Sequence, residues 1–165
     1  MADEQLQQDG EIKLTKEFIE KAYEAFAKGK VTIKDFRGLD DAQMEAIYSL
    51  GYNFYQTGRI ADARTVFEGL TILDQLNAKY WIALAATFQE EDNWDRAALC
   101  YQTALLMDET DPRPPFHLAE FFARKGMREQ VEACVELLKK LAKAEGTDYL
   151  PRAERLLAGM GGGNQ

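Results

Sequence analysis

The sequence is poor in residues that interrupt helices and in residues that build metal or redox sites. Its 165 residues include four prolines, two cysteines and one histidine. Cys100 and Cys134 do not form a C-x-x-C pair, so zinc binding and redox chemistry have no support, and two isolated thiols fit a reducing compartment. The prolines fall only at 112, 114, 115 and 151, and the segments between are rich in Ala, Leu, Glu, Lys and Gln. This composition predicts helices.

Long apolar runs and an excess of positive charge are also missing. A charged or amide side chain interrupts every apolar stretch, so no segment approaches the roughly 20 apolar residues that span a bilayer. The first eight residues lack the basic start and apolar core of a secretory signal. A net charge of −8 would repel nucleic acid. We therefore expect a cytoplasmic protein that neither binds nucleic acid nor inserts into membranes.

Local signals place several helix starts. Thr15 is a candidate N-cap for a first helix that ends at Gly29, and its apolar residues recur on one face: Phe18, Ile19, Tyr23 and Phe26. Thr32 with Asp35, and Asp40 with Gln43, have the spacing of a capping box. Each pair predicts the start of a further helix.

An internal repeat begins near residue 44, with a period of about 34 residues. Shifting the sequence by one period aligns residues of the same kind: Leu50 with Leu84 and Leu118, Gly51 with Ala85 and Ala119, and Phe54 with Phe88 and Phe122. The small residues let paired helices lie close together. This period and pattern are typical of tetratricopeptide repeats, which are helix hairpins that stack on one another.

The repeats define the expected architecture. We predict an all-α fold in which three tetratricopeptide repeats form a concave right-handed superhelical stack, with an N-terminal helix and a C-terminal capping helix. The single domain 1–165 divides into an N-terminal helical region 1–43, repeats at 44–77, 78–111 and 112–145, a capping helix 146–158 and a flexible tail 159–165. Turns within the repeats are expected near Gly58, Asp92 to Asn93, and Gly126.

Repeat geometry separates core positions from groove positions. In the first repeat, Ile47, Leu50, Gly51 and Phe54 are assigned to the core. Three tyrosines at spacings of four and three residues then face the groove, where they would offer apolar area with a polar tip. The same positions of the third repeat are Phe116, Glu120 and Ala123. The residues predicted to bind a client peptide are Tyr48, Tyr52, Tyr55, Ile82, Ala86, Gln89 and Phe116. The alternative is that the N-terminal helix folds over the tyrosines and uses them for packing.

Catalytic and metal sites have no good candidates. His117 has no Cys, Ser or carboxylate arrangement nearby in the sequence that would form a triad, so a structural role is expected. The acidic run from Glu90 to Asp92 is typical of a solvated turn. Cys100 and Cys134 are one repeat apart and are expected to be small buried residues. We predict no enzyme activity, no cofactor and no metal.

Three segments resemble the class II chaperones of bacterial type III secretion. They are VTIKDFRGLDDAQMEAIYSLGYNFYQTGRIADARTVFEGL from residue 31, AKYWIALAATFQ from residue 78 and DPRPPFHLAE from residue 111. Generic tetratricopeptide proteins share the period, but they are not expected to share these blocks together. The resemblance covers residues 12 to 145.

The resemblance implies a cytoplasmic bacterial chaperone that binds two hydrophobic translocator proteins before export and prevents their aggregation or premature association. Such chaperones hold an extended N-terminal segment of the client in the groove, and Tyr48, Tyr52 and Tyr55 match family groove positions. Members also form homodimers through the N-terminal helical region, which here would use Phe18, Ile19, Tyr23 and Phe26. The alternative is a general tetratricopeptide scaffold or co-chaperone. A carboxylate clamp for charged tails, however, needs Lys and Asn at the positions of Tyr48 and Tyr52.

Overall fold

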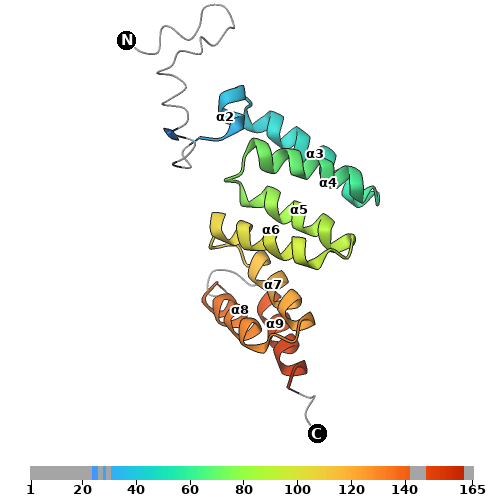
Figure 1. Cartoon of the computed structure of the whole chain (residues 1–165), viewed down its shortest axis with the longest axis vertical. Helices are drawn as coiled ribbons and strands as arrows, with labels where there is room; N and C mark the ends of the chain where they lie inside the picture. Colours follow the sequence, from blue (N-terminus) through green and yellow to red (C-terminus); the bar gives the residue numbers. More distant parts are fainter. Residues whose placement is uncertain (1–23, 26–27, 29–30, 142–147, 162–165) are drawn as a thin grey trace, which may run out of the picture.

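Every regular element that the structure describes is an α-helix. The structure is a computed structural model that describes residues 24–25, 28, 31–141 and 148–161. Its helices are α2 (Ile33–Arg37), α3 (Asp41–Gln56), α4 (Ile60–Leu73), α5 (Ala78–Glu90), α6 (Trp94–Met107), α7 (Arg113–Arg124), α8 (Arg128–Leu141) and α9 (Tyr149–Gly159). Figure 1 shows them stacked one after another along the long axis. The predicted all-α class is confirmed.

Reciprocal side-chain hydrogen bonds cap the N-termini of α2 and α3. The Thr32 hydroxyl accepts from the backbone N–H of Asp35, and the Asp35 carboxylate accepts from the backbone N–H of Thr32 at 2.7 Å. Asp40 and Gln43 exchange the same pair of bonds, at 2.7 and 3.0 Å. Both capping boxes are confirmed, and each satisfies backbone donors that a helix start leaves unpaired.

Successive helices form three hairpins: α3 with α4, α5 with α6, and α7 with α8. Each hairpin turns at a residue with left-handed backbone, namely Gly58 (φ 76°), Asp92 (φ 56°) and Gly126 (φ 71°). These three residues lie one repeat apart, at equivalent positions of the three hairpins. The predicted turns are confirmed, and Asp92 occupies a conformation in which aspartate is more common than most non-glycine residues.

Small residues let the helices of a pair approach closely. Ala85 and Ala119 are completely buried. At the equivalent position in α3, a Cβ atom added to Gly51 would lie 2.7 Å from Cε1 of Phe67 and 2.9 Å from Cγ1 of Val66. Only a residue without a side chain fits there unless α4 shifts.

The prediction that Leu50 belongs to the core is wrong. Leu84 and Leu118, at the same position of the later repeats, are each 4% exposed, whereas Leu50 is 50% exposed. Leu84 and Leu118 are covered because a preceding helix pair packs on their repeats. Among the described residues no helix pair precedes α3, so its outer face forms the open edge of the stack.

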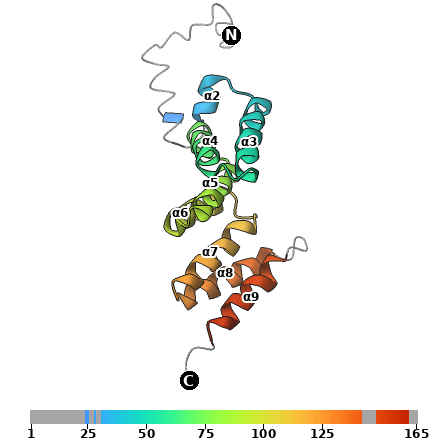
Figure 2. The same ribbon diagram turned by 90° about the vertical axis from the view of Figure 1, so that its right-hand side faces the viewer.

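The other end of the stack is closed by α9, which packs against both α7 and α8 and buries Ala153. Figure 2 shows α9 beside these two helices. The expected C-terminal capping helix is therefore present. The four N-terminal residues assigned to a dimer contact lie outside the described residues: Phe18, Ile19, Tyr23 and Phe26.

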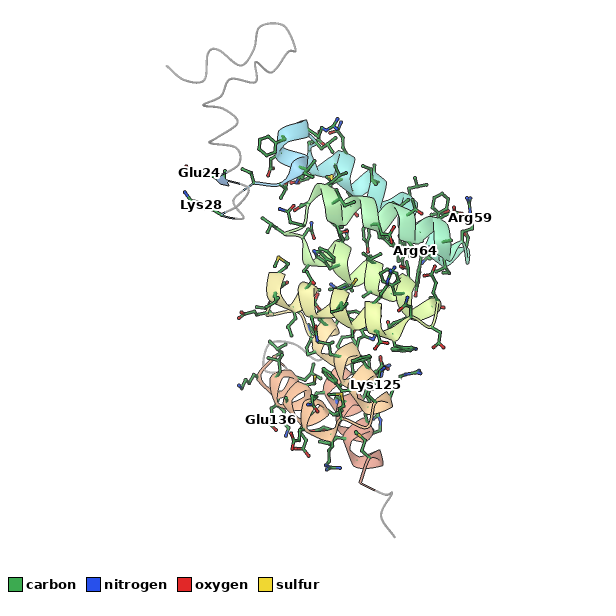
Figure 3. The ribbon with its side chains drawn as sticks, in the orientation of Figure 1. Glu24, Lys28, Arg59, Arg64, Lys125 and Glu136 are labelled. Atoms are coloured by element: carbon green, nitrogen blue, oxygen red, sulfur yellow. The ribbon has the colours of Figure 1, made fainter. Side chains whose placement is uncertain are left out.

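Ion pairs join neighbouring hairpins along the side of the stack where the turns within the repeats lie. Arg64 of α4 pairs with Glu91 at 3.1 Å, and Lys125 pairs with Asp95 of α6 at 3.0 Å. Arg64 and Lys125 lie toward the same end of their hairpins in Figure 3. Such exposed pairs contribute about 0 to 1 kcal/mol each, so buried apolar residues carry most of the stability. In the described part of the chain, no helix is long and apolar enough to cross a bilayer.

Candidate peptide-binding groove

Three tyrosines line one face of α3, which we call the tyrosine face: Tyr48, Tyr52 and Tyr55. The rings of Tyr48 and Tyr52 stack with their centroids 6.3 Å apart and their planes 12° from parallel. Tyr52 is exposed, while Tyr48 and Tyr55 are half-buried. The spacing read from the sequence therefore produces a partly open aromatic surface.

Tyr48 is fixed from beneath and from the side. Its ring contacts those of Phe67 and Tyr80, with centroids 5.6 and 6.0 Å away. The ammonium of Lys79 lies 3.8 Å from the ring centroid and also pairs with Glu45 at 2.7 Å. Burial raises the pKa of the Tyr48 hydroxyl above its ordinary value. The group is therefore neutral at physiological pH and serves as a hydrogen-bonding tip on a rigid ring.

Tyr55 links the first repeat to the second. Its hydroxyl donates to Oε1 of Glu90 at 3.1 Å. Burial, followed by the negative charge of Glu90, raises the pKa of Tyr55. This bond orients the last tyrosine of the face and places a carboxylate beside it.

The groove candidates of the second repeat lie mostly below the surface. Ile82 is buried, and Ala86 and Gln89 are half-buried. The side-chain oxygen of Gln89 accepts a hydrogen bond from the Tyr101 hydroxyl. Burial raises the pKa of Tyr101 far above its usual range, so this hydroxyl stays protonated and remains a donor. Gln89 is thereby held in one orientation.

Phe116, the candidate of the third repeat, is only 1% exposed. Tyr149 of α9 packs on its ring with centroids 5.2 Å apart, and the guanidinium of Arg152 lies 4.3 Å from the ring centroid. A bound segment can therefore contact Phe116 only if α9 shifts. The capping helix occupies the side of α7 that the sequence assigned to a client.

His117 has structural partners. Its ring stacks on Tyr101 with centroids 4.7 Å apart, and its Nδ1 lies 2.8 Å from Oε2 of Glu120. Cys100 and Cys134 are both buried, as expected. No cluster of three or more metal-ligating side chains occurs among the residues described.

The sequence reading missed the charged residues that border the tyrosine face. Glu45, Lys79 and Arg113 are spaced one repeat apart, so they occupy the same position in successive repeats. The repeat register places Lys79 beside Glu45, which explains their ion pair. The positive charge of Arg113 acts to lower the pKa of Tyr48, against the larger effect of burial, which raises it. Extending the alignment of the repeats to polar positions would have identified these residues.

Helix hairpins that recur at a period of about 34 residues and stack on one another define a tetratricopeptide protein. The tetratricopeptide repeat family matches residues 44–77. Low calcium response locus protein H of Yersinia pestis is 33% identical over 135 residues, which are 82% of this chain and 80% of the relative.

Solved structures of similar proteins also have this fold. The type III secretion translocator chaperone SycD of Yersinia enterocolitica has a TM-score of 0.71 and 30% identity, covering 78% of this chain and 98% of SycD. PcrH of Pseudomonas aeruginosa, in complex with the chaperone binding region of PopD, has a TM-score of 0.68 and 32% identity over 75% of this chain and 95% of PcrH. This chain belongs to the family of type III secretion translocator chaperones, which is a non-enzymatic class.

Proposed function

We propose that this chain is a cytoplasmic chaperone that binds an extended apolar segment of a hydrophobic type III secretion translocator and keeps that client from aggregating before export. The main support for the proposal is the tyrosine face of this chain, which is partly open to a ligand. PcrH and SycD have been solved with translocator segments, from PopD and YopD respectively. The scaffold of this site consists of three repeats, which span residues 44–77, 78–111 and 112–145.

The proposed contacts follow from accessibility. Tyr52, which is 47% exposed, offers the most ring surface, and the half-buried Tyr48 and Tyr55 offer less. Ala86 and Gln89 continue the surface on α5, and Ile82 forms its floor. Phe116 becomes available to a client only if α9 shifts. Burying one leucine-sized client residue contributes roughly 1.5 to 3 kcal/mol, and ordering a disordered segment costs several kcal/mol. Two or three apolar anchors are therefore required.

Binding of the chaperone binding region of PopD, measured by fluorescence anisotropy, tests the proposal. Replacing Tyr48, Tyr52 and Tyr55 together with Ala is expected to abolish binding. Tyr48 also packs on the core, so Tyr52→Ala alone is the cleaner variant, and it should weaken binding at least about tenfold because it removes an aromatic anchor. Tyr52→Phe keeps the ring and is the matched control. Unchanged affinity in Tyr52→Ala and in a still helical triple variant would refute the proposal.

We also propose a homodimer that uses Phe18, Ile19, Tyr23 and Phe26. The support is the apolar face that these residues share in the sequence, together with the dimeric arrangement named for SycD. Sedimentation of the full chain and of a chain lacking residues 1–30 tests this assignment. A dimer that persists after the deletion would refute it.

A further inference from the structure

A second apolar surface lies on the second helices of the first two repeats. Ile72 of α4 is 62% exposed, and Leu99 and Leu106 of α6 are 64% and 74% exposed. Leu76, in the loop that follows α4, and Met107, the last residue of α6, add further exposed apolar area. We call this set the second-helix patch: Ile72, Leu76, Leu99, Leu106 and Met107. Single exposed leucines are common on proteins, but a group that shares one face requires an explanation.

The repeat register relates the members of the patch to one another. Ile72 and Leu106 are one repeat apart and therefore occupy the same position on the second helices of successive repeats, while Leu99 and Leu106 are two turns apart on one face of α6. In the third repeat, the residues equivalent to Leu99 and Leu106 are Ala133 and Lys140. The patch is thus confined to the first two repeats, which also carry the tyrosine face and the Ile82 floor.

An open cleft lies between the second-helix patch and Lys79, which borders the tyrosine face. The cleft, of about 500 Å³, lies between the loops that follow α4 and α6. Leu76 and Met107 of the patch line it, and so does Lys79, whose ammonium lies over the Tyr48 ring. A chain leaving the tyrosine face can therefore reach the patch round this end of the helices without crossing the core.

The acids of the cleft outnumber its bases: Asp74, Asp108 and Asp111 line it beside Lys79 and Arg113. Within the described ranges, Asp74 and Asp108 have no Lys or Arg in ion-pair distance, although Lys34 acts on Asp74 and Arg113 on Asp108 from further away. Asp108 accepts hydrogen bonds from Thr110. The other acid of the cleft, Asp111, is neutralised by Arg113. A partner crossing here is favoured if it carries basic residues next to its apolar segment.

From the position and charge of the cleft, we propose that the second-helix patch binds a second apolar segment of the same client, in helical form. Lys or Arg residues that flank this client segment would lie near Asp74 and Asp108. The proposal rests on the proposed function. A membrane-destined client has apolar helices of about 20 residues, typically flanked by basic residues, and a short groove-bound segment leaves them uncovered. The patch supplies apolar contact and the cleft supplies the matching charge.

Site-specific photocrosslinking tests the proposal, with a benzoylphenylalanine placed at Leu106, at Tyr52 or at Lys140. The full chain is co-expressed with full-length PopD or with its chaperone binding region alone. We expect position 106 to crosslink full-length PopD only, position 52 to crosslink both probes, and position 140 to crosslink neither. Lys140 is the matched control because it is exposed at the position equivalent to Leu106.

The outcomes separate the two proposals. Crosslinking at 52 without crosslinking at 106 overturns the second-helix patch and leaves the groove intact. Crosslinking of full-length PopD at 106 but of neither probe at 52 supports the patch and overturns the groove. Absence of crosslinking at positions 52 and 106 overturns both the groove proposal and the patch proposal. Crosslinking at 106 to a second copy of this chain shows that the patch is a self-association surface and also overturns the proposal.

Substitution gives an independent readout. The triple variant Ile72→Gln, Leu99→Gln and Leu106→Gln alters exposed side chains, so the melting temperature is expected to stay near that of the unaltered chain. Affinity for the chaperone binding region of PopD should stay within about twofold, while the yield of soluble full-length PopD should fall at least about tenfold. An unchanged yield of the full-length client overturns the proposal.

Discussion

Gly51 shows how one residue sets the distance between two helices. A Cβ atom at this position would lie under 3 Å from Phe67 and Val66. Phe67 is buried and cannot move aside without disturbing the core. The absence of a side chain therefore allows α3 and α4 to pack at their observed separation.

Gly51→Ala is expected to lower the free energy of unfolding by about 1 to 3 kcal/mol, because the added methyl group overpacks the α3 and α4 contact. Chemical denaturation followed by circular dichroism measures this change. Gly69→Ala is the matched control: Gly69 lies inside α4, and an added Cβ there meets nothing within 4 Å. The control should gain about 0.5 to 1 kcal/mol from helix propensity. A loss of stability in both variants would contradict the argument.

The two cysteines are expected to be unreactive in the folded protein. Burial raises the pKa of Cys100 and Cys134 to about 11, and the thiolate is the reactive form. At pH 8 only about a thousandth of each thiol is ionised, and access is restricted as well. Titration with a chromogenic disulfide should be slow in the native state, faster as the pH rises toward 11, and rapid in denaturant. Rapid reaction of the native protein at pH 8 would show that burial is incomplete in solution.

At the scale of elements, α9 both ends the stack and covers Phe116. Its Ala153 is completely buried, whereas Ala158 on the same helix is exposed. Tyr149 and Arg152 of this helix lie over the Phe116 ring. Loss of α9 docking would thus expose an aromatic side chain of α7.

Ala153→Leu is expected to destabilise the protein by about 1 to 3 kcal/mol through overpacking of the cap. Binding of a hydrophobic dye should rise as α9 detaches and Phe116 becomes exposed. Ala158→Leu makes the same chemical change at an exposed position and should alter stability by less than about 0.5 kcal/mol. Equal effects of the two substitutions would argue against the observed packing of α9.

Elements with local signals were predictable from the sequence, but burial at the ends of the stack was not. The Thr32 and Asp40 capping boxes and the turns at Gly58 and Gly126 depend on a few adjacent residues, and all were predicted. The exposure of Leu50 depends on what lies beyond α3. The burial of Phe116 depends on α9 packing onto α7. Such relations between distant elements leave no mark in a short sequence window.

The candidate site was predictable in part for the same reason. Helical spacing was enough to place Tyr48, Tyr52 and Tyr55 on one face, and repeat geometry directed that face outward. Lys79 was missed because the comparison of repeats did not include the position that it shares with Glu45 and Arg113. Its ion pair with Glu45 joins equivalent positions of two repeats, so the signal was present in the register.

For the whole molecule, the position of a repeat in the stack decides what its residues contribute. Leu84→Ala and Leu118→Ala should each cost about 2 to 5 kcal/mol, because these side chains are buried between helix pairs. Leu50→Ala should cost less than about 1 kcal/mol, because Leu50 is half exposed at the open edge. Thermal denaturation of the three variants measures the difference. Similar losses in all three would mean that another segment or chain covers Leu50 in solution.

Within the described residues, the two ends of the stack differ: the α3 end is open, and the other end is covered by α9. A head-to-tail filament would need the open end of one chain to dock on the far end of the next, but α9 already occupies the surface of α7 and α8 on which a further hairpin would pack. Among the described residues, the α3 edge can therefore pair with a second α3 edge but not with the surface of α7 and α8. A contact between two like ends closes at two chains, so it does not lead to open-ended polymerisation.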